Sequence, residues 1–253
     1  MNWSNTDWAK MDQLYYPKRK VDNTMSRYFG FNIGSIRSQK MNIKVEYESL
    51  TECLFYYFLE LDPKTVRYYV QPVNIPVSVL SNQEMKVYNH VPDVLVYRTD
   101  HQPMLFQVKA KDLQEGDKNY AAFLRHNLAC EEYARLKQWS YSIIYPRSTD
   151  GIVISNVKNI IRYKKKRKHF LELVPQLLYK LPYFENCTID RLVSSFESVC
   201  ERKYIIPHVY HLIAEAQIWI NLFEPIHAHS EIRPGNSYVM LEETMLSEER
   251  GSI

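Results

Sequence analysis

The segment "VPDVLVYRTDHQPMLFQVKAK" (residues 91–111) constrains the fold most, because it predicts a buried hairpin that carries polar side chains at one end. "DVLVY" and "MLFQVKA" are apolar enough to form strands that need burial, and "DHQ" supplies a turn between them. Asp93 begins the first strand, and Gln107 and Lys109 share parity on the second, so their side chains leave the same face. A hairpin places the start of its first strand opposite the end of its second. We therefore expect Asp93 and Lys109 to meet at one end of the sheet.

Glu52 is a third polar group that belongs to this pattern. It lies in the first turn of a helix predicted within "VEYESLTECLFYYFLELDPKTV", where Ser49 and Glu52 have capping-box spacing and Asp62-Pro63 ends the helix. This helix is apolar around most of its circumference, which is typical of a buried helix. If the face of Glu52 packs near the hairpin, two carboxylates, an amide and an ammonium converge. Burying such charges is costly unless they are paired or bind a metal.

A cluster of this composition suits phosphodiester cleavage. Carboxylate oxygens are hard ligands that Mg²⁺ prefers. A bound metal lowers the pKa of water and neutralises charge on the transition state. A nearby lysine can stabilise the same charge or position the attacking water. We find no Ser-His-Asp pattern that would supply a covalent nucleophile.

Each of these residues also has a structural explanation, which is the better one when the residue is taken alone. Glu52 can be only the partner of a capping box, Asp93 after Pro92 a turn residue, and Lys109 a charge that protects an edge strand. The order of the residues along the chain favours a shared site. A glutamate is followed by Pro-Asp, then by a hairpin of suitable length, then by Gln-x-Lys.

The rest of the chain predicts an α/β half and a mostly helical half. The first half has an extended segment in "YYVQPVNIPVSVL", a helix in "GDKNYAAFLRHNLACEEYARLKQW" and a strand in "SYSIIYP". After Pro146, helices are predicted in "NVKNIIRYKKKRKHFLELVPQLLYKL", "TIDRLVSSFE" and "YHLIAEAQIWINLFEP". We therefore predict an N-terminal extension (1–29), an α/β domain (30–147), a separable helical domain (148–228) and a mobile tail (229–253).

Composition excludes several classes of protein. With 45% hydrophobic and 24% charged residues the chain is globular rather than disordered. Its apolar runs are too short to span a bilayer, and "MNWSNTDWAKMDQLYYPKRK" has no secretion-signal pattern. The cysteines form no CxxC pair, so we expect reduced, mostly buried thiols in a cytoplasmic protein and no zinc site. They are Cys53, Cys130, Cys187 and Cys200.

These residues, in this order, resemble the PD-(D/E)XK nuclease superfamily, with Pro92-Asp93 as "PD" and Gln107-Val108-Lys109 carrying Gln in the (D/E) position. The flank "SIRSQKMNIKVEYESLTECLFYYFLELDPKTVRYYVQPV" is similar to the N-terminal region of TnsA, the endonuclease subunit of heteromeric transposases. The resemblance covers about residues 30 to 145 and continues more weakly through the helical half. The shared features are Ser38-Gln39-Lys40, Tyr47 to Glu52, Glu60 to Val66, and Gln71-Pro72.

The resemblance implies a restriction-endonuclease-like core, with a mixed sheet flanked by helices, followed by a winged-helix-like C-terminal domain. It implies a Mg²⁺-dependent endonuclease, with Mn²⁺ as a substitute, that cuts the 5′ strands of transposon-end DNA. A TnsB-like transposase would cut and join the 3′ ends, and the C-terminal domain would contact a TnsC-like ATPase. By matching position, Glu52 and Asp93 would be metal ligands, Gln107 would occupy the third ligand-like position, and Lys109 would be the catalytic lysine. Cys53 departs from the family, in which a basic or bulky residue commonly follows the glutamate.

Basic residues outside this cluster are candidates for DNA contact. The run after the domain boundary can follow DNA phosphates or simply form a solvated helix face, and the sequence favours neither. The candidates are Lys40, Lys111, Lys158, Arg162, Lys164, Lys165, Lys166 and Arg167.

Two alternative functions remain open at this point. One is a restriction or repair nuclease outside transposition. The other is a non-catalytic adaptor that keeps the nuclease fold, although the complete set of Glu52, Asp93 and Lys109 argues against it.

Overall fold

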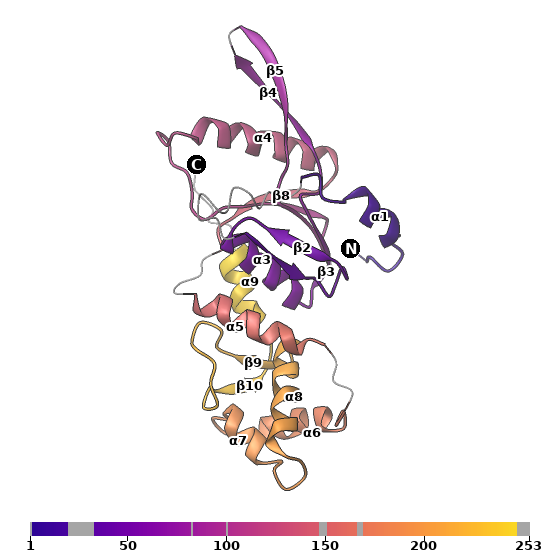
Figure 1. The fold of residues 1–253 in the computed structure, drawn as a ribbon, viewed down its shortest axis with the longest axis vertical. Helices are drawn as coiled ribbons and strands as arrows, with labels where there is room; N and C mark the ends of the chain where they lie inside the picture. Colours follow the sequence, from indigo (N-terminus) through magenta and orange to yellow (C-terminus); the bar gives the residue numbers. More distant parts are fainter. Residues whose placement is uncertain are drawn as a thin grey trace. The chain divides into compact units, whose positions relative to one another are not determined.

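A computed structural model describes residues 2–19, 33–81, 83–99, 101–146, 151–165 and 169–246 (Figure 1). The chain divides into two compact units. The first, which we call the sheet unit, combines the described residues up to Cys53 with those from Lys64 to Pro146. The second, the helical unit, combines Leu54–Pro63 with the described residues between 147 and 246. This division differs from a single boundary near residue 148, because one segment of the N-terminal half belongs to the helical unit.

The centre of the sheet unit is a four-stranded mixed sheet. It contains β3 (Thr65–Val70), β6 (Val94–Arg98), β7 (Met104–Val108) and β8 (Ser140–Ile144), in the order β3-β6-β7-β8. The pairs β3–β6 and β6–β7 are antiparallel, and β7–β8 is parallel. The predicted mixed sheet is therefore present.

The pairing of β6 with β7 confirms the hairpin that the sequence predicts. Val94 lies opposite Phe106 and Leu95 opposite Leu105. One step further along this register brings Asp93 beside Gln107. The first strand is buried throughout and the second almost so, because both faces of this part of the sheet are covered.

Helices flank the sheet within this unit. α4 (Tyr120–Leu136) packs against β8. α1 (Trp8–Leu14) lies against the sheet, with the Trp8 ring edge-on to Tyr97 at 5.5 Å between centroids. Asp12 of this helix accepts a hydrogen bond from the Arg67 guanidinium on β3 at 3.0 Å. The described part of the predicted N-terminal extension is thus packed on the sheet unit.

Two further hairpins belong to the sheet unit. β1 (Gly34–Arg37) pairs with β2 (Lys44–Tyr47), and β4 (Ile75–Ser81) pairs with β5 (Glu84–His90). The β4–β5 hairpin, which we call the ribbon, extends away from the four-stranded sheet past α4 (Figure 1). The sequence predicts β4 as extended but does not predict β5, in which Met85 and Val87 share one face and are both exposed.

α3 (Leu50–Leu61) is the predicted buried helix, and its capping box is formed. The Glu52 amide donates to Ser49 Oγ at 3.1 Å, and Glu52 Oε2 accepts from the Glu48 amide at 2.9 Å. The helix ends immediately before Asp62-Pro63, as predicted. Its first turn, with Glu52, belongs to the sheet unit, and its residues from Leu54 belong to the helical unit.

The helical unit is built mostly from short helices around an apolar core. The two-stranded pair β9–β10 is antiparallel, with Ile220 opposite Ile232. The elements after residue 147 are α5 (Ile152–Ile160), η1 (Ile161–Tyr163), α6 (Leu173–Lys180), η2 (Leu181–Tyr183), α7 (Ile189–Ser194), α8 (Arg202–Ala214), β9 (Ile218–Ile220), β10 (Ile232–Pro234) and α9 (Tyr238–Leu246).

Two predictions about this unit are wrong. The helix predicted across "YHLIAEAQIWINLFEP" ends at Ala214, because Ala216 has a positive φ of 59° and the β-prone "IWI" forms a strand. The mobile tail predicted from residue 229 is wrong for residues 232–246. There α9 buries Leu241 and Met245, and the Tyr238 hydroxyl donates to the Ile213 carbonyl at 2.9 Å. Residues 247–253 of the predicted tail lie outside the described residues.

Candidate functional site

Asp93 lies at the end of the β6–β7 hairpin and is held by its neighbours on β7. Its Oδ2 atom accepts a hydrogen bond from the Val108 amide at 2.7 Å and a second one from Gln107 Nε2. Within the described part of the chain, Oδ1 of Asp93 accepts no hydrogen bond. One carboxylate oxygen is therefore fixed by the hairpin, and the other remains able to bind a cation.

The charge of Asp93 is unfavourable where it lies. Burial is the largest cause that raises the pKa of Asp93 to about 7, and the charge of Glu52 raises it further. Lys109 and the Val108 amide act in the opposite direction without cancelling these effects. Burial also raises the pKa of Glu52. Two carboxylates whose ionisation is opposed in this way would both be stabilised by a cation between them.

Glu52 has the capping role that its sequence position predicts, and it also lies close enough to Asp93 for its charge to act there. It completes the capping box of α3, and its charge acts on Asp93. The structural explanation is therefore correct without excluding the functional one. A glutamate in the first turn of a helix is a rigid carrier for a carboxylate, because the cap bonds restrict its side chain.

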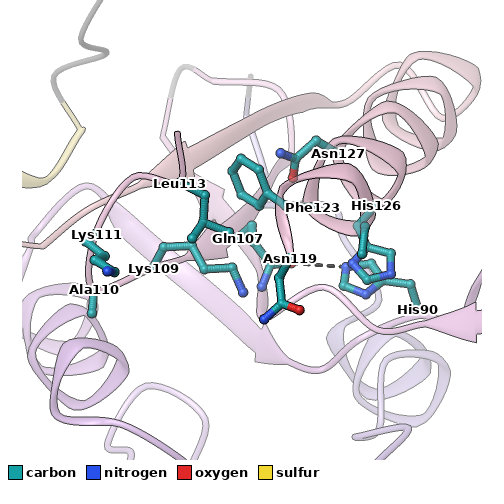
Figure 2. A pocket seen from close by; sticks show the side chains of 11 residues that line it. His90, Gln107, Lys109, Ala110, Lys111, Leu113, Asn119, Phe123, His126 and Asn127 are labelled. Atoms are coloured by element: carbon teal, nitrogen blue, oxygen red, sulfur yellow. Dashed lines mark hydrogen bonds between the residues drawn. The ribbon is translucent and has the colours of Figure 1, made fainter. Parts of the chain in front are cut away.

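Gln107 and Lys109 both line a cavity of about 470 Å³ at the end of β7 (Figure 2). The parity of the two residues on the strand predicts this shared face. Lys111, one of the candidates for DNA contact, also lines the cavity. Two ammonium groups and the amide that donates to Asp93 thus border this space, whereas Asp93 and Glu52 are not among the residues that line it. The ammonium groups make it a suitable environment for a phosphate.

Both polar atoms of the Gln107 amide have partners. Its Nε2 donates to Asp93, and its Oε1 lies 3.1 Å from Nε2 of His90 at the end of β5. The His90 ring stacks on the His126 ring of α4, with centroids 4.2 Å apart and an interplanar angle of 5°. Sequence reasoning missed His90, because it lies on a strand that was not predicted and has no recognisable spacing from Gln107.

The remaining basic candidates lie elsewhere. Lys40 donates to the Thr65 carbonyl, and Lys164 lies 4.0 Å from Glu215 in the helical unit. Neither residue lines the cavity. Lys158, Arg162 and Lys165 also belong to the helical unit, and Lys166 and Arg167 lie outside the described residues.

A site with three acidic or metal-binding side chains is absent from the part of the chain that the structure describes. No group of three or more His, Cys, Asp or Glu residues is placed there to hold a metal. Glu52 and Asp93 provide two carboxylates, and the third position of the predicted motif is the neutral amide of Gln107. No described helix is long and apolar enough to cross a membrane.

Fold and site together define a class: an α/β protein whose mixed sheet carries carboxylates, an amide and a lysine at the end of a central hairpin. Comparison with protein families makes this more specific. Residues 62–145 match the family described as TnsA-like endonuclease N terminal. This match confirms, over that segment, the resemblance to TnsA-like endonucleases seen in the sequence. The match contains Asp93, Gln107 and Lys109 and begins after Glu52. No curated protein matches the chain.

Proposed function

We propose that this protein is the metal-dependent endonuclease subunit of a Tn7-like transposase complex, which hydrolyses the 5′ strands at transposon ends. The observation that carries the proposal is the position of Asp93. Its carboxylate accepts a hydrogen bond from β7, and its ionisation is disfavoured by the charge of Glu52 and favoured by that of Lys109. Asp93 lies within the segment that matches a TnsA-like endonuclease domain.

The residues of the site fit Mg²⁺, with Mn²⁺ as a substitute. The raised pKa of Asp93 shows that this carboxylate lacks a sufficient counter-charge, and its Oδ1 atom accepts no hydrogen bond within the described residues. Glu52 and Asp93 would hold the cation through hard oxygen atoms. When bound, the metal would supply an activated water and neutralise phosphate charge.

The other residues would act on the DNA and on the carboxylates. Lys109 borders the cavity, where its ammonium would stabilise the negative charge that develops on the scissile phosphate. Lys111 would contact a neighbouring phosphate. The resemblance places Gln107 in the third ligand-like position. Its contacts with Asp93 and His90 support a role in orienting Asp93.

The helical unit would provide the contacts with partners. Its short helices and the β9–β10 pair support the winged-helix-like domain that the resemblance implies. This unit would contact a TnsC-like ATPase, and a TnsB-like transposase would process the 3′ ends. The basic residues Lys158, Arg162 and Lys165 are available there for DNA phosphates. A restriction or repair nuclease would keep the same site without these partners.

Reconstitution tests the proposal directly. The purified chain is combined with its transposase and ATPase on transposon-end DNA, and nicks are mapped on each strand with Mg²⁺, with Mn²⁺ and without metal. We expect metal-dependent 5′-strand nicks, which Asp93→Ala and Lys109→Ala abolish while 3′-strand cleavage by the transposase continues. Lys10→Ala, at an exposed position of α1, is the matched control and should cut normally. Cleavage of the 3′ strand alone by the wild-type complex would refute the proposal.

A further inference from the structure

A chain of hydrogen bonds connects His90 to Asp93 through one side chain. His90 Nε2 lies 3.1 Å from Gln107 Oε1 (Figure 2). Gln107 Nε2 in turn donates to Asp93 Oδ2. The three residues come from the end of β5, the end of β7 and the start of β6. The ribbon is thereby linked to the carboxylate of the proposed site by a single amide.

The chemistry of an amide sets which group donates and which accepts in these hydrogen bonds. A glutamine side chain has one accepting oxygen and one donating NH₂ group, and an ionised carboxylate can only accept. When Asp93 is ionised, as it would be above pH 7 or beside a cation, Gln107 must therefore turn its NH₂ group to it, which leaves its oxygen facing His90. His90 must in turn carry its proton on Nε2 to make the remaining bond. Turning the amide over would set two acceptors against each other at Asp93.

His90 is held so that it can play this part. Its ring is stacked on His126, whose Nε2 lies 2.9 Å from the Tyr88 hydroxyl. Stacking on His126 and the contact with Gln107 Oε1 hold the ring with Nε2 toward the amide. A neutral ring has one donor and one acceptor, and the donor is needed on the side of Gln107.

We infer that His90 is a positioning residue for the endonuclease site, which acts by orienting the Gln107 amide and, through it, the metal-binding carboxylate of Asp93. The inference rests on the proposed function. His90 fixes the carbonyl of Gln107, and Gln107 together with the Val108 amide occupies Oδ2 of Asp93. Oδ1 is then the oxygen presented to the cation. Gln107 serves as an orienting group behind the ligand.

A packing role for His90 is the competing explanation, and one substitution separates the two. Phenylalanine preserves the flat ring that stacks on His126 but removes the Nε2 donor. Glutamine loses the aromatic ring but places an amide N–H near the position of Nε2. If His90 acts through its hydrogen bond, His90→Phe is defective and His90→Gln recovers function. If His90 only packs, the order is reversed.

The measurements are Mn²⁺ affinity by calorimetry, thermal unfolding without metal, and kcat and KM for nicking in the reconstituted complex. Loss of a partner that orients a metal ligand typically weakens affinity or activity about 10- to 100-fold. We expect His90→Phe to weaken Mn²⁺ binding and lower kcat by about tenfold with little change in KM for DNA. His90→Gln should recover most of this loss. His101→Phe, at an exposed histidine of the same unit, is the matched control and should behave as wild type.

A double-mutant comparison tests whether Gln107 transmits the effect. In the Gln107→Ala background, His90→Phe should produce no further loss of Mn²⁺ affinity, because the connection is already broken. NMR of the metal-free wild type should show the His90 ring protonated on Nε2. It should also show that a side-chain NH₂ signal of Gln107 shifts in Asp93→Ala.

The outcomes separate failure of the inference from failure of the proposed function. A wild-type protein that binds no Mn²⁺ and makes no 5′-strand nicks overturns both. If the wild type binds and cuts, and Asp93→Ala does neither, then normal affinity and kcat in His90→Phe overturn the inference alone. If His90→Phe does not fold, the inference is tested by the tautomer of His90 in the wild type and by the Mn²⁺ affinity of His90→Gln. Protonation of His90 on Nδ1, or failure of a folded His90→Gln to bind Mn²⁺ more tightly than the Gln107→Ala variant, contradicts the inference.

Discussion

Two of the antiparallel hairpins in the sheet unit, β6–β7 and the ribbon, differ sharply in burial. In the β6–β7 hairpin, nine of the ten strand positions are buried. In the ribbon, the six β5 residues from Glu84 to Asn89 are exposed. Leu105 on β7 is fully buried, whereas Leu80 on β4 is 68% exposed.

Because the two hairpins differ in burial, a polar residue needs an explanation in the β6–β7 hairpin but not on the exposed part of the ribbon. A polar side chain on the ribbon is solvated, so its presence there costs little. Asp93 and Gln107 lie at the buried end of the other hairpin, where polar groups are costly unless they have partners. The buried hairpin keeps these groups and satisfies them with each other and with His90, the last residue of the ribbon. The two hairpins therefore meet at the proposed site.

The first prediction concerns the two leucines. We expect Leu105→Ala to lower the free energy of unfolding by about 3 kcal/mol, because it removes buried contacts and leaves a cavity. Leu80→Ala should change it by less than about 0.5 kcal/mol, because that side chain is mostly solvated. Denaturant unfolding of both variants checks the comparison. Equal losses would mean that the ribbon is buried in the folded protein in solution.

A smaller effect is expected from converting an amide to an acid. Gln107→Glu sets a carboxylate against Asp93, so at pH 8 without metal it should lower stability by about 2 kcal/mol. Mg²⁺ or Mn²⁺ should restore most of this loss by neutralising the added charge. Asn89→Asp, the same change on the exposed ribbon, should have almost no effect with or without metal. Thermal melts across a metal titration check this prediction. It is wrong if Gln107→Glu melts like the wild type in the absence of metal.

The third prediction concerns the pH dependence of stability due to Asp93. Its pKa of about 7 in the folded protein lies above the ordinary value of an aspartate, so the folded state holds a proton that the unfolded state has released between about pH 4 and 7. Stability without metal should therefore fall as the pH rises through this range. Asp93→Asn should remove this fall and raise stability at pH 8, by as much as about 4 kcal/mol for a pKa difference of about 3, with no gain below pH 4.

The control for this prediction is Glu84→Gln on the exposed ribbon, whose pH profile of unfolding should match the wild type. Added Mg²⁺ should flatten the wild-type profile above pH 7, because the cation stabilises the ionised carboxylate. The opposite result would be a wild-type stability that rises steadily from pH 4 to 7, with Asp93→Asn less stable at pH 8. It would show that the surroundings stabilise the ionised carboxylate of Asp93.

Much of the site could be predicted because its signals are local. The apolar strands around Asp93 and Gln107, the parity of Gln107 and Lys109, and the spacing of Ser49 and Glu52 each depend on residues close together in sequence. The structure contains that hairpin, that shared cavity face and that capping box. The assignment of Glu52, Asp93, Gln107 and Lys109 to metal binding and catalysis stays a prediction.

The parts that could not be predicted depend on contacts between distant segments. β5 exists as a strand because it pairs with β4, and its residues from Glu84 to Asn89 are exposed rather than packed in a core. The strand Ile218–Ile220 exists because Ile232–Pro234 returns to pair with it, and α9 is ordered by burial of Tyr238. The tertiary fold alone also places the end of α3 in the helical unit.

The sequence by itself determined which residues could form a site, because side-chain chemistry, strand parity and helix capping act over a few residues. It determined the mixed α/β character of the first half and the position of Asp93 at the end of its hairpin. Only the tertiary structure decided that burial and Glu52 raise the pKa of Asp93 to about 7. It also decided that Gln107 turns its NH₂ group to Asp93 and its oxygen to His90, 17 residues earlier in the chain. Desolvation and hydrogen-bond direction depend on everything that surrounds a group, and the order of residues along the chain does not contain that information.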